Sequence, residues 1–337
     1  MDDLPEHTPN QKLCFILGVG QRSGTNYIYN LLKQHPACIG PGPIWQDYVL
    51  EKSSLLTEYV NHIYQRWNPN WEVTNKVAPP DTLLRYFGES IERFLRLQIT
   101  NESINTNVPQ EENTKQNSST IFLTKTPSVT GLENIFEIFP EAFLILIIRD
   151  GRTVVESGVR SFDWDYEIAT RKWAAAANTI YQIKKKYENT SKNFLIIKYE
   201  DLFTDEKSEL IKMFNYLELN ANDYNFDATA ELGVTGSSDV RKQMGNVHWD
   251  ATKKTQDFNP LARFKSWNTK RHDRFNWIAG KSMNNFGYKL HNDYSNKLTN
   301  IAKNKFYDAL RIIITFSYKL FRKTIYATRH IRPKHTT

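Results

Sequence analysis

Four short runs of apolar residues constrain the fold of this chain most strongly. They show little alternation between apolar and polar positions, so a strand formed by any of them would be apolar on both faces. Strands of this kind occur in parallel sheets that helices cover on both sides. The four runs are Leu13–Leu17, Ile121–Leu123, Phe143–Ile148 and Phe194–Ile197.

Stretches that favour helices alternate with these runs. Thr25–Lys33 follows the first run, Asp81–Gln98 has apolar residues near helical spacing, and Glu167–Tyr187 contains four consecutive alanines. Thr204 precedes two acidic residues and an apolar stripe, which predicts a helix with Thr204 as its N-cap. Strand–helix alternation predicts an α/β fold with three layers, α/β/α, around a central, mainly parallel sheet.

One segment interrupts the alternation. Asn101–Thr120 consists mostly of Asn, Thr, Ser, Gln and Glu, which are too polar to form a packed core. We therefore expect a mobile insertion at residues 100–120, just before the second strand.

The positive charge of the chain lies at its C-terminal end. The net charge of the 337 residues is +7, whereas Lys303–Lys334 holds nine Lys and Arg and one acid, a charge of +8 that leaves −1 for the rest. A body that binds nucleic acid would be expected to carry its own basic face, so this class is excluded. Two cysteines and the absence of His/Cys spacings typical of zinc sites predict no metal.

The basic tail has apolar residues near helical spacing from Phe306 to Leu320, with Lys and Arg between them. Such a helix either packs on the body or lies on an anionic membrane surface. The first twelve residues are polar and acidic, unlike a secretory signal, and no apolar stretch approaches the roughly 20 residues of a membrane span. We therefore expect a cytoplasmic protein, with peripheral membrane contact through the tail as an alternative.

The first motif joins a predicted strand to a predicted helix. The sequence Gly18-Val-Gly-Gln-Arg-Ser-Gly-Thr-Asn26 combines glycines, one cation and hydroxyl side chains at the start of a helix. Main-chain N–H groups in such a turn form a binding site for an anion. The third glycine of a dinucleotide fingerprint is missing, because Ser23 stands there, and the lysine of an ATP- or GTP-binding loop is missing as well.

The second motif follows the most apolar run. Arg149 comes directly after that run, and Ser157 lies eight residues later, about two helical turns into the next element. A guanidinium and a hydroxyl on the same side of the element would bind one phosphate together. The alternative is a helix capped by Asp150 with solvated arginines.

Together these segments resemble the sulfotransferase superfamily, which uses 3′-phosphoadenosine-5′-phosphosulfate (PAPS). The resemblance covers roughly Lys12 to Leu290 and rests on the order and spacing of five pieces. Besides the two motifs, the matching pieces are Leu123–Pro127, Ile197–Leu202 and a closing region that contains Leu261–Trp267, Ile278–Gly280 and Phe286–Tyr288. The resemblance implies a P-loop-like sulfotransferase fold over residues 1–295, followed by the tail at 296–337.

The resemblance also implies roles for individual residues. The 5′-phosphosulfate would be held by Gln21, Arg22, Ser23, Gly24, Thr25 and Asn26. Arg149 and Ser157 would hold the 3′-phosphate, Tyr199 would contact the adenine, and Arg263 and Lys265 would close over the same phosphate. Arg22 and Lys125 are the cations expected to stabilise the departing phosphate, and no metal is required.

An acceptor hydroxyl or amine needs a general base. The family's histidine two residues after the lysine is absent, because position 127 is Pro. Members that act on sugars or protein tyrosines place a carboxylate after the first helix, which points to Asp47, with Glu51 and His62 as reserves. We expect the acceptor pocket between Gly40–Tyr64 and Phe162-Asp163-Trp164, where aromatic residues gather.

The predicted function is the transfer of a sulfuryl group from PAPS to a hydroxyl or amine of a small-molecule, carbohydrate or lipid acceptor. Two alternatives remain. A P-loop kinase of small molecules would share the strand–loop–helix start, and a non-catalytic nucleotide-binding protein would keep the fold without the chemistry.

Overall fold

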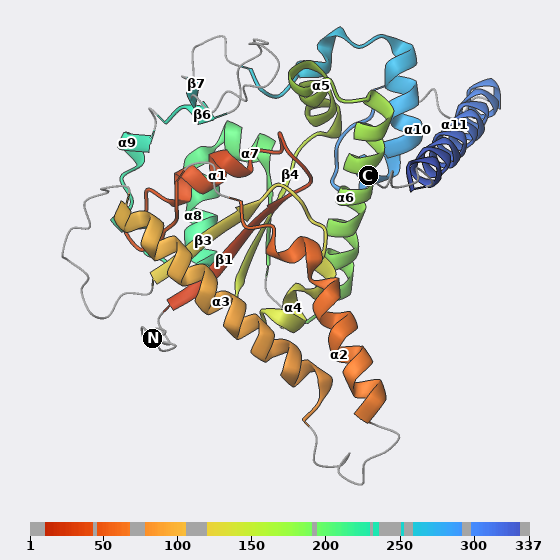
Figure 1. Ribbon diagram of the computed structural model, residues 1–337. Helices are drawn as coiled ribbons and strands as arrows, with labels where there is room; N and C mark the ends of the chain where they lie inside the picture. Colours follow the sequence, from red (N-terminus) through yellow and green to blue (C-terminus); the bar gives the residue numbers. More distant parts are fainter. Residues whose placement is uncertain are drawn as a thin grey trace, which may run out of the picture.

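The computed structural model describes residues 11–42, 46–67, 78–105, 120–190, 194–229, 232–235, 251–252, 259–291 and 298–330. Five parallel strands form the central sheet in the order β2-β3-β1-β4-β5 (Figure 1). The strands are β1 (Gln11–Gly18), β2 (Cys38–Ile39), β3 (Thr120–Thr126), β4 (Phe143–Ile148) and β5 (Leu195–Lys198). A separate antiparallel pair is formed by β6 (Val234–Thr235) and β7 (Ala251–Thr252).

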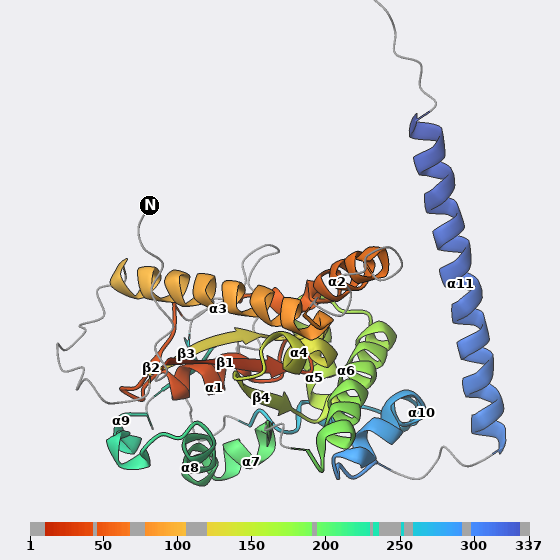
Figure 2. The same cartoon turned by 90° about the horizontal axis from the view of Figure 1, so that it is seen from below.

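Helices cover both faces of the sheet, which confirms the predicted α/β fold (Figures 1 and 2). The α-helices are α1 (Thr25–Leu32), α2 (Ser54–Trp67), α3 (Pro80–Asn105), α4 (Ile135–Ile138), α5 (Gly151–Phe162), α6 (Tyr166–Tyr187), α7 (Tyr199–Thr204), α8 (Glu206–Tyr216), α9 (Phe226–Thr229), α10 (Thr269–Asn285) and α11 (Leu298–His330). Short 3-10 turns are η1 (Val49–Lys52), η3 (Leu132–Asn134), η4 (Ala221–Asp223) and η5 (Arg263–Ser266).

The strands are apolar on both faces because each face lies in a different core. Leu13, Phe15 and Leu17 of β1 pack with residues of α3, α4, α6 and α10. The alternate residues Cys14 and Ile16 pack with residues of α1 and α8. One strand therefore supplies side chains to two cores, as the unbroken apolar runs predict.

Two local predictions need correction. Thr204 is the last residue of α7, and the N-cap of α8 is Asp205, whose side chain accepts a hydrogen bond from the Ser208 N–H. A carboxylate is as good a cap as a hydroxyl and also complements the helix dipole. The helix α3 continues through Asn105, so the first residues of the predicted insertion are helical. Residues 106–119 of that insertion lie outside the described residues.

The C-terminal tail contains the long helix α11, which extends away from the body in Figure 2. Within the described residues, no helix has both the length and the apolar character needed to cross a membrane. The predicted boundary between residues 295 and 296 lies in the segment 292–297, outside the described residues, and stays a prediction.

The parallel arrangement brings three loops together. β1 lies between β3 and β4, and Leu17 pairs with Thr126 on one side and Leu146 on the other. The carboxyl ends of these strands therefore meet at one edge of the sheet, the usual place for a ligand in an open α/β fold. The loop after β1, the end of β3 and the turn after β4 all lie there.

The contact between α3 and α4 supplies a test of the fold. A Cβ atom added to Gly88 would lie 1.8 Å from the carbonyl oxygen of Ile138. Although alanine favours a helix over glycine by about 1 kcal/mol, we expect Gly88→Ala to lower the free energy of unfolding by about 1–3 kcal/mol, because the backbone of α4 must move. Urea unfolding followed by circular dichroism measures this.

Gly280→Ala in α10 is the matched control. Its added Cβ would meet only the flexible Leu290 side chain, at 3.3 Å. We expect its unfolding free energy to stay within about 1 kcal/mol of the parent protein. A Gly88→Ala protein as stable as Gly280→Ala would contradict the close approach of α3 and α4.

Candidate active site

The loop between β1 and α1 has a backbone that needs glycine. Gly20 and Gly24 have φ values of 154° and 104°, and Arg22 also lies in the left-handed region, at 71°. Ser23 donates a hydrogen bond from Oγ to the Gly20 carbonyl at 2.7 Å, which holds the turn closed. Gly24 is the N-cap of α1, so the loop ends on the N–H groups of a helix, where anions bind.

Glycine at position 24 is also required by its neighbour. A Cβ atom there would lie 2.3 Å from the ring of Tyr199, the first residue of α7. Tyr199 is only 1% exposed, and its ring packs against the loop at Gly24. The sequence predicts both residues at the nucleotide, and the structure brings them into contact.

The two predicted anion motifs meet directly. Arg22 donates from Nε to the Ser157 hydroxyl at 2.8 Å and from Nη2 to the Ser161 hydroxyl at 3.3 Å. Arg149 donates from Nη1 to the carbonyl of Arg22 at 2.7 Å. The sequence predicts Arg22 at one phosphate and the Arg149/Ser157 pair at another. In the structure, the Arg22 side chain reaches across to Ser157 and joins the two groups.

Arg149 is buried at the centre of this arrangement, with an exposed fraction of 6%. Its guanidinium stacks on Tyr199, 4.0 Å from the ring centroid, and Nη2 donates to the Pro260 carbonyl at 2.6 Å. Burial lowers the pKa of Arg149, and the neighbouring charge of Arg263 lowers it further. The predicted residue Arg263 therefore lies close to Arg149. Lys265, on the same 3-10 turn, is exposed to solvent.

Asp47, the predicted base, is hydrogen-bonded to the end of β3. The carboxylate of Asp47 accepts hydrogen bonds from the hydroxyls of Thr124 and Thr126, the latter at 3.0 Å. It also accepts from the N–H of Val49, the first residue of η1, at 2.8 Å. Alternation along β3 places both threonines on one face of the sheet and Lys125, between them, on the other.

Lys125 is fully buried, and its Nζ has no hydrogen-bond partner among the described residues. The ammonium lies 5.8 Å from the centroid of the Tyr29 ring. Burial lowers the pKa of Lys125 to about 8, while the nearby charge of Asp47 acts in the opposite direction. A buried cation without a partner is costly unless an anion binds beside it.

A cavity of about 720 Å³ opens beside the loop after β1, a size typical of pockets for small molecules. Its wall includes Gly20 and Gln21 of the loop, Tyr48 and Glu51 of the predicted acceptor region, and Trp164. The rest of the wall comes from Val19, Val154 and the segments 127–130 and 165–179. The cavity therefore lies between the two segments that the sequence predicts as the acceptor pocket.

Some predicted residues lie elsewhere. Asp47 does not belong to the cavity wall, whereas the reserve residue Glu51 does. His62 is exposed on α2, outside that wall. Two aromatic residues of α2 serve packing: Tyr59 meets Phe87 of α3, and Tyr64 packs on Trp67. Trp45, within the predicted acceptor region, lies outside the described residues.

Sequence reasoning missed several supporting residues. Ser161 accepts a hydrogen bond from Arg22, as Ser157 does, and lies one helical turn further along α5. Its i+4 spacing from Ser157 could have predicted that both hydroxyls lie on one face of the helix. Glu200 accepts from the Asp150 N–H and from the Tyr288 hydroxyl, both at 2.8 Å. Trp173 donates to the Arg149 carbonyl at 3.1 Å, a contact between distant segments with no local signal.

The described residues hold no group of three or more His, Cys, Asp or Glu side chains that would bind a metal ion. The metal-independent reaction stays a prediction, since residues outside the described ranges also carry carboxylates.

Comparisons with known proteins agree on one family. A sequence model of the sulfotransferase family matches residues 14–223, well over half of the chain. That range includes the loop after β1, Asp47, Lys125, the Arg149 motif and Tyr199, and it ends before Arg263 and Lys265. No curated protein sequence matches the chain.

Solved structures of sulfotransferases resemble the chain at low identity. The sulfotransferase domain of the olefin synthase from Synechococcus PCC 7002 is 18% identical, with a TM-score of 0.45, over 86% of this chain and 99% of that one. Sulfotransferase STF9 from Mycobacterium avium is 13% identical, with a TM-score of 0.37, over 84% of this chain and 79% of that one. Mouse sulfotransferase SULT7A1, complexed with PAP, is 10% identical, with a TM-score of 0.38, over 90% of each chain.

The family match covers the loop, the cations and the carboxylate that meet at the carboxyl edge of the sheet. The chain belongs to the sulfotransferase family, a family of enzymes that use PAPS.

Proposed function

We propose that this enzyme transfers the sulfuryl group of PAPS to a hydroxyl or amine of a small-molecule, carbohydrate or lipid acceptor, without a metal. One observation carries the proposal: Arg149 binds the Arg22 carbonyl at 2.7 Å while the Arg22 side chain binds Ser157 at 2.8 Å. Two anion-binding motifs that are 127 residues apart thus form one cationic site. A nucleotide with phosphates at both its 5′ and 3′ positions matches such a site.

The residues of the site fit an anionic donor. Lys125 Nζ and Arg149 Nε are buried nitrogen atoms without hydrogen-bond partners among the described residues. The start of α1 adds main-chain N–H groups and a favourable dipole. We assign the 5′-phosphosulfate to residues 21–26 and the 3′-phosphate to Arg149 and Ser157. Arg263 and Lys265 would close over the 3′-phosphate, and Tyr199 would contact the adenine.

When bound, PAPS would supply a sulfuryl group for in-line transfer: a bond forms between the acceptor and sulfur while the bond from sulfur to the 5′-phosphate oxygen breaks, which leaves negative charge on that oxygen. The role of this chain is to fix positive charge where that oxygen lies. We assign this role to Arg22 and Lys125. Lys125 is already desolvated, so its ammonium needs little solvent rearrangement during the reaction and acts at a low local dielectric.

The acceptor proton requires a base, and Asp47 is our first assignment. Its carboxylate already accepts from the hydroxyls of Thr124 and Thr126 and from the Val49 N–H. A carboxylate can accept about four hydrogen bonds, so roughly one position on Asp47 remains for the hydroxyl or amine of the substrate. The three bonds hold the side chain still, which favours a positioned base. Glu51, on the cavity wall, is the second candidate.

The cavity beside the loop is our assignment for the acceptor. Its wall is largely apolar on the α6 side, with Ile168, Ala169 and Trp173, while Glu51 and Lys172 supply charge. A wall of this composition suits an acceptor with an apolar body and a polar reacting group.

Binding of adenosine 3′,5′-bisphosphate tests the donor assignment. We expect isothermal titration calorimetry to give an affinity for this desulfated donor at least about tenfold higher than for ATP or NAD, because only the desulfated donor has a 3′-phosphate for Arg149 and Ser157.

Ser157→Ala removes one hydrogen bond to a charged group and should weaken binding of the desulfated donor by about tenfold or more. Ser282→Ala is the matched control: its hydroxyl bonds a main-chain carbonyl in α6, away from the loop. Equal affinities for all three nucleotides would refute the donor assignment, and tight binding without transfer to any acceptor would indicate a non-catalytic nucleotide-binding protein.

Replacing the carboxylate tests the base. We expect Asp47→Asn to lower kcat by about 10²–10⁴, with the affinity for adenosine 3′,5′-bisphosphate nearly unchanged, since Asn keeps the shape of the side chain. Conversion of PAPS is measured with a panel of phenol, sugar and amine acceptors. Glu51→Gln is measured in parallel: a large loss there, with full activity in Asp47→Asn, would move the base to Glu51.

The pKa of Lys125 predicts a pH dependence. The charged form is the useful one, and with a pKa of about 8 it is lost as the pH rises above 8. We therefore expect kcat/KM, which reports the free enzyme, to fall on the alkaline side of pH 8. In Lys125→Arg the guanidinium stays charged up to about pH 12, so this fall should move out of the measured range, even though the larger group lowers the rate. Lys172→Arg, at the cavity wall, is the control and should leave the fall in place. An unchanged alkaline limb in Lys125→Arg would exclude Lys125 as its origin.

A further inference from the structure

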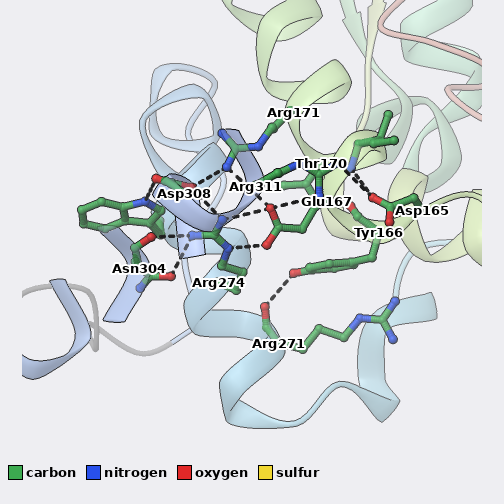
Figure 3. Close-up of polar contacts among 12 residues, drawn as sticks. Asp165, Tyr166, Glu167, Thr170, Arg171, Arg271, Arg274, Asn304, Asp308 and Arg311 are labelled. Carbon is green, nitrogen blue, oxygen red and sulfur yellow. Dashed lines mark hydrogen bonds and ion pairs between the residues drawn. The ribbon is translucent and has the colours of Figure 1, made fainter. Parts of the chain in front are cut away.

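The helix α11 contacts the body through a polar side. Asp308 accepts from Arg274 at 2.7 Å, from Trp277 Nε1 at 2.9 Å and from Arg171. Arg274 also donates to the side chain of Asn304, at 3.1 Å. Figure 3 shows Arg171 of α6, Arg274 of α10, and Asn304 and Asp308 of α11 pointing toward one another.

A second group of ion pairs extends the same contact. Glu167 of α6 accepts from Arg274 at 2.6 and 2.9 Å, and Arg311 of α11 reaches Glu167 at 3.5 Å. Burial alone would raise the pKa of Asp308 and of Glu167, but hydrogen bonds, chiefly from Trp277 and Arg274, bring both pKa values below their usual range. The polar side of α11 is thus satisfied by the body.

The apolar side of α11 faces away from this contact. Successive helix residues turn by about 100°, so Phe306 and Ile313 point about 160–180° away from the midpoint of the docked residues Asn304 and Asp308, and Phe316 points about 100° away from it. Their exposed fractions are 65%, 61% and 68%. These three side chains lie outside both cores of the body. A soluble helix normally buries its apolar side, and here the polar side is docked instead.

Positive charge borders the apolar side. Lys303 and Lys305 are exposed and lie about 80° to either side of Ile313. Asp308, the one acid between Lys303 and Lys334, is neutralised on the docked side by Arg171 and Arg274. Outward-facing charge on this part of the helix is therefore basic only. Lysines beside an apolar stripe allow the stripe to enter a lipid interface while the ammonium groups stay at the phosphate level.

We propose that α11 is an interfacial helix that binds an anionic lipid surface through Phe306, Ile313 and Phe316, with Lys303 and Lys305 at the headgroups. The ion pairs with α6 and α10 fix the helix to the body, so lipid binding holds the whole enzyme at the membrane surface. The charge disfavours a second copy as the occupant: two such segments, each with nine Lys and Arg against one acid, repel each other. This inference is independent of the donor and the acceptor.

Vesicle flotation with the full-length protein tests the proposal, with no nucleotide present. We expect binding to vesicles of phosphatidylcholine with 30% phosphatidylglycerol, little binding to phosphatidylcholine alone, and release in high salt, because the attraction to anionic lipid is screened. K303Q/K305Q should weaken binding roughly 25-fold, from about fivefold for each lysine. K184Q/K186Q, which removes two exposed lysines of α6, is the matched control and should bind normally.

A second variant tests the apolar side. F306S/I313S/F316S changes only exposed side chains, so its thermal transition should match that of the parent, while binding to anionic vesicles falls by more than about 100-fold. Undiminished binding of this variant would overturn the proposal, as would the absence of binding by the parent. Sedimentation of the parent in the absence of lipid provides a further check. A dimer that this variant abolishes would assign the apolar side to a second copy and would also overturn the proposal.

Discussion

The buried guanidinium of Arg149 is the interaction on which the site depends. It binds the carbonyls of Arg22 and Pro260, which are 127 and 111 residues away along the chain, and it stacks on Tyr199. Its partners in these bonds are carbonyl oxygens and not carboxylates, so its charge is solvated but not cancelled. Glu200, whose charge acts on Arg149, itself accepts hydrogen bonds from the Asp150 N–H and the Tyr288 hydroxyl. Burial raises the pKa of Glu200, which weakens it further as a counter-ion. Positive charge therefore remains at the edge of the sheet, as an anion-binding site requires.

The sheet also separates two groups that the reaction would use together. Lys125 lies on the face of the sheet covered by α1, and Asp47 is bound to Thr124 and Thr126 on the other face. A cation and a carboxylate on the same face would form an ion pair and satisfy each other. Separation by one strand leaves the charge of Asp47 near enough to raise the pKa of Lys125 while the ammonium stays unpaired. Alternation along a single strand thus keeps both groups available.

The sequence predicts the parts of this enzyme that depend on local pattern. The apolar runs predict four of the five strands, because burial on both faces leaves a continuous signal; β2, with only Cys38 and Ile39, is too short to leave one. The glycine-rich loop and the Arg149/Ser157 spacing are local as well.

Contacts between distant segments leave no such local pattern in the sequence. The bond from Arg22 to Ser157, the threonines that hold Asp47, and the docking of Asp308 on Arg171 and Arg274 depend on how elements pack. The sequence predicts Thr204 as the N-cap of α8, whereas the structure has Asp205 in that position. The error is small, because either side chain can accept a hydrogen bond from the first N–H groups of a helix.

The distribution of charge separates two tasks within one chain. The body is nearly neutral overall, so acids elsewhere in it offset the cations of the proposed nucleotide site, which limits long-range attraction and leaves selectivity to geometry. The tail carries +8 over its last residues and has little geometric selectivity, which suits a surface defined by charge and apolar depth. Two ion pairs, Asp308 with Arg171 and Arg311 with Glu167, join α11 directly to α6, the helix that also lines the cavity with Ile168 and Trp173. The proposed lipid contact and the proposed acceptor site are therefore linked by a single rigid element. An acceptor with an apolar body would be concentrated at the surface that α11 is proposed to bind, which makes the apolar wall of the cavity and the apolar side of α11 two consequences of one environment.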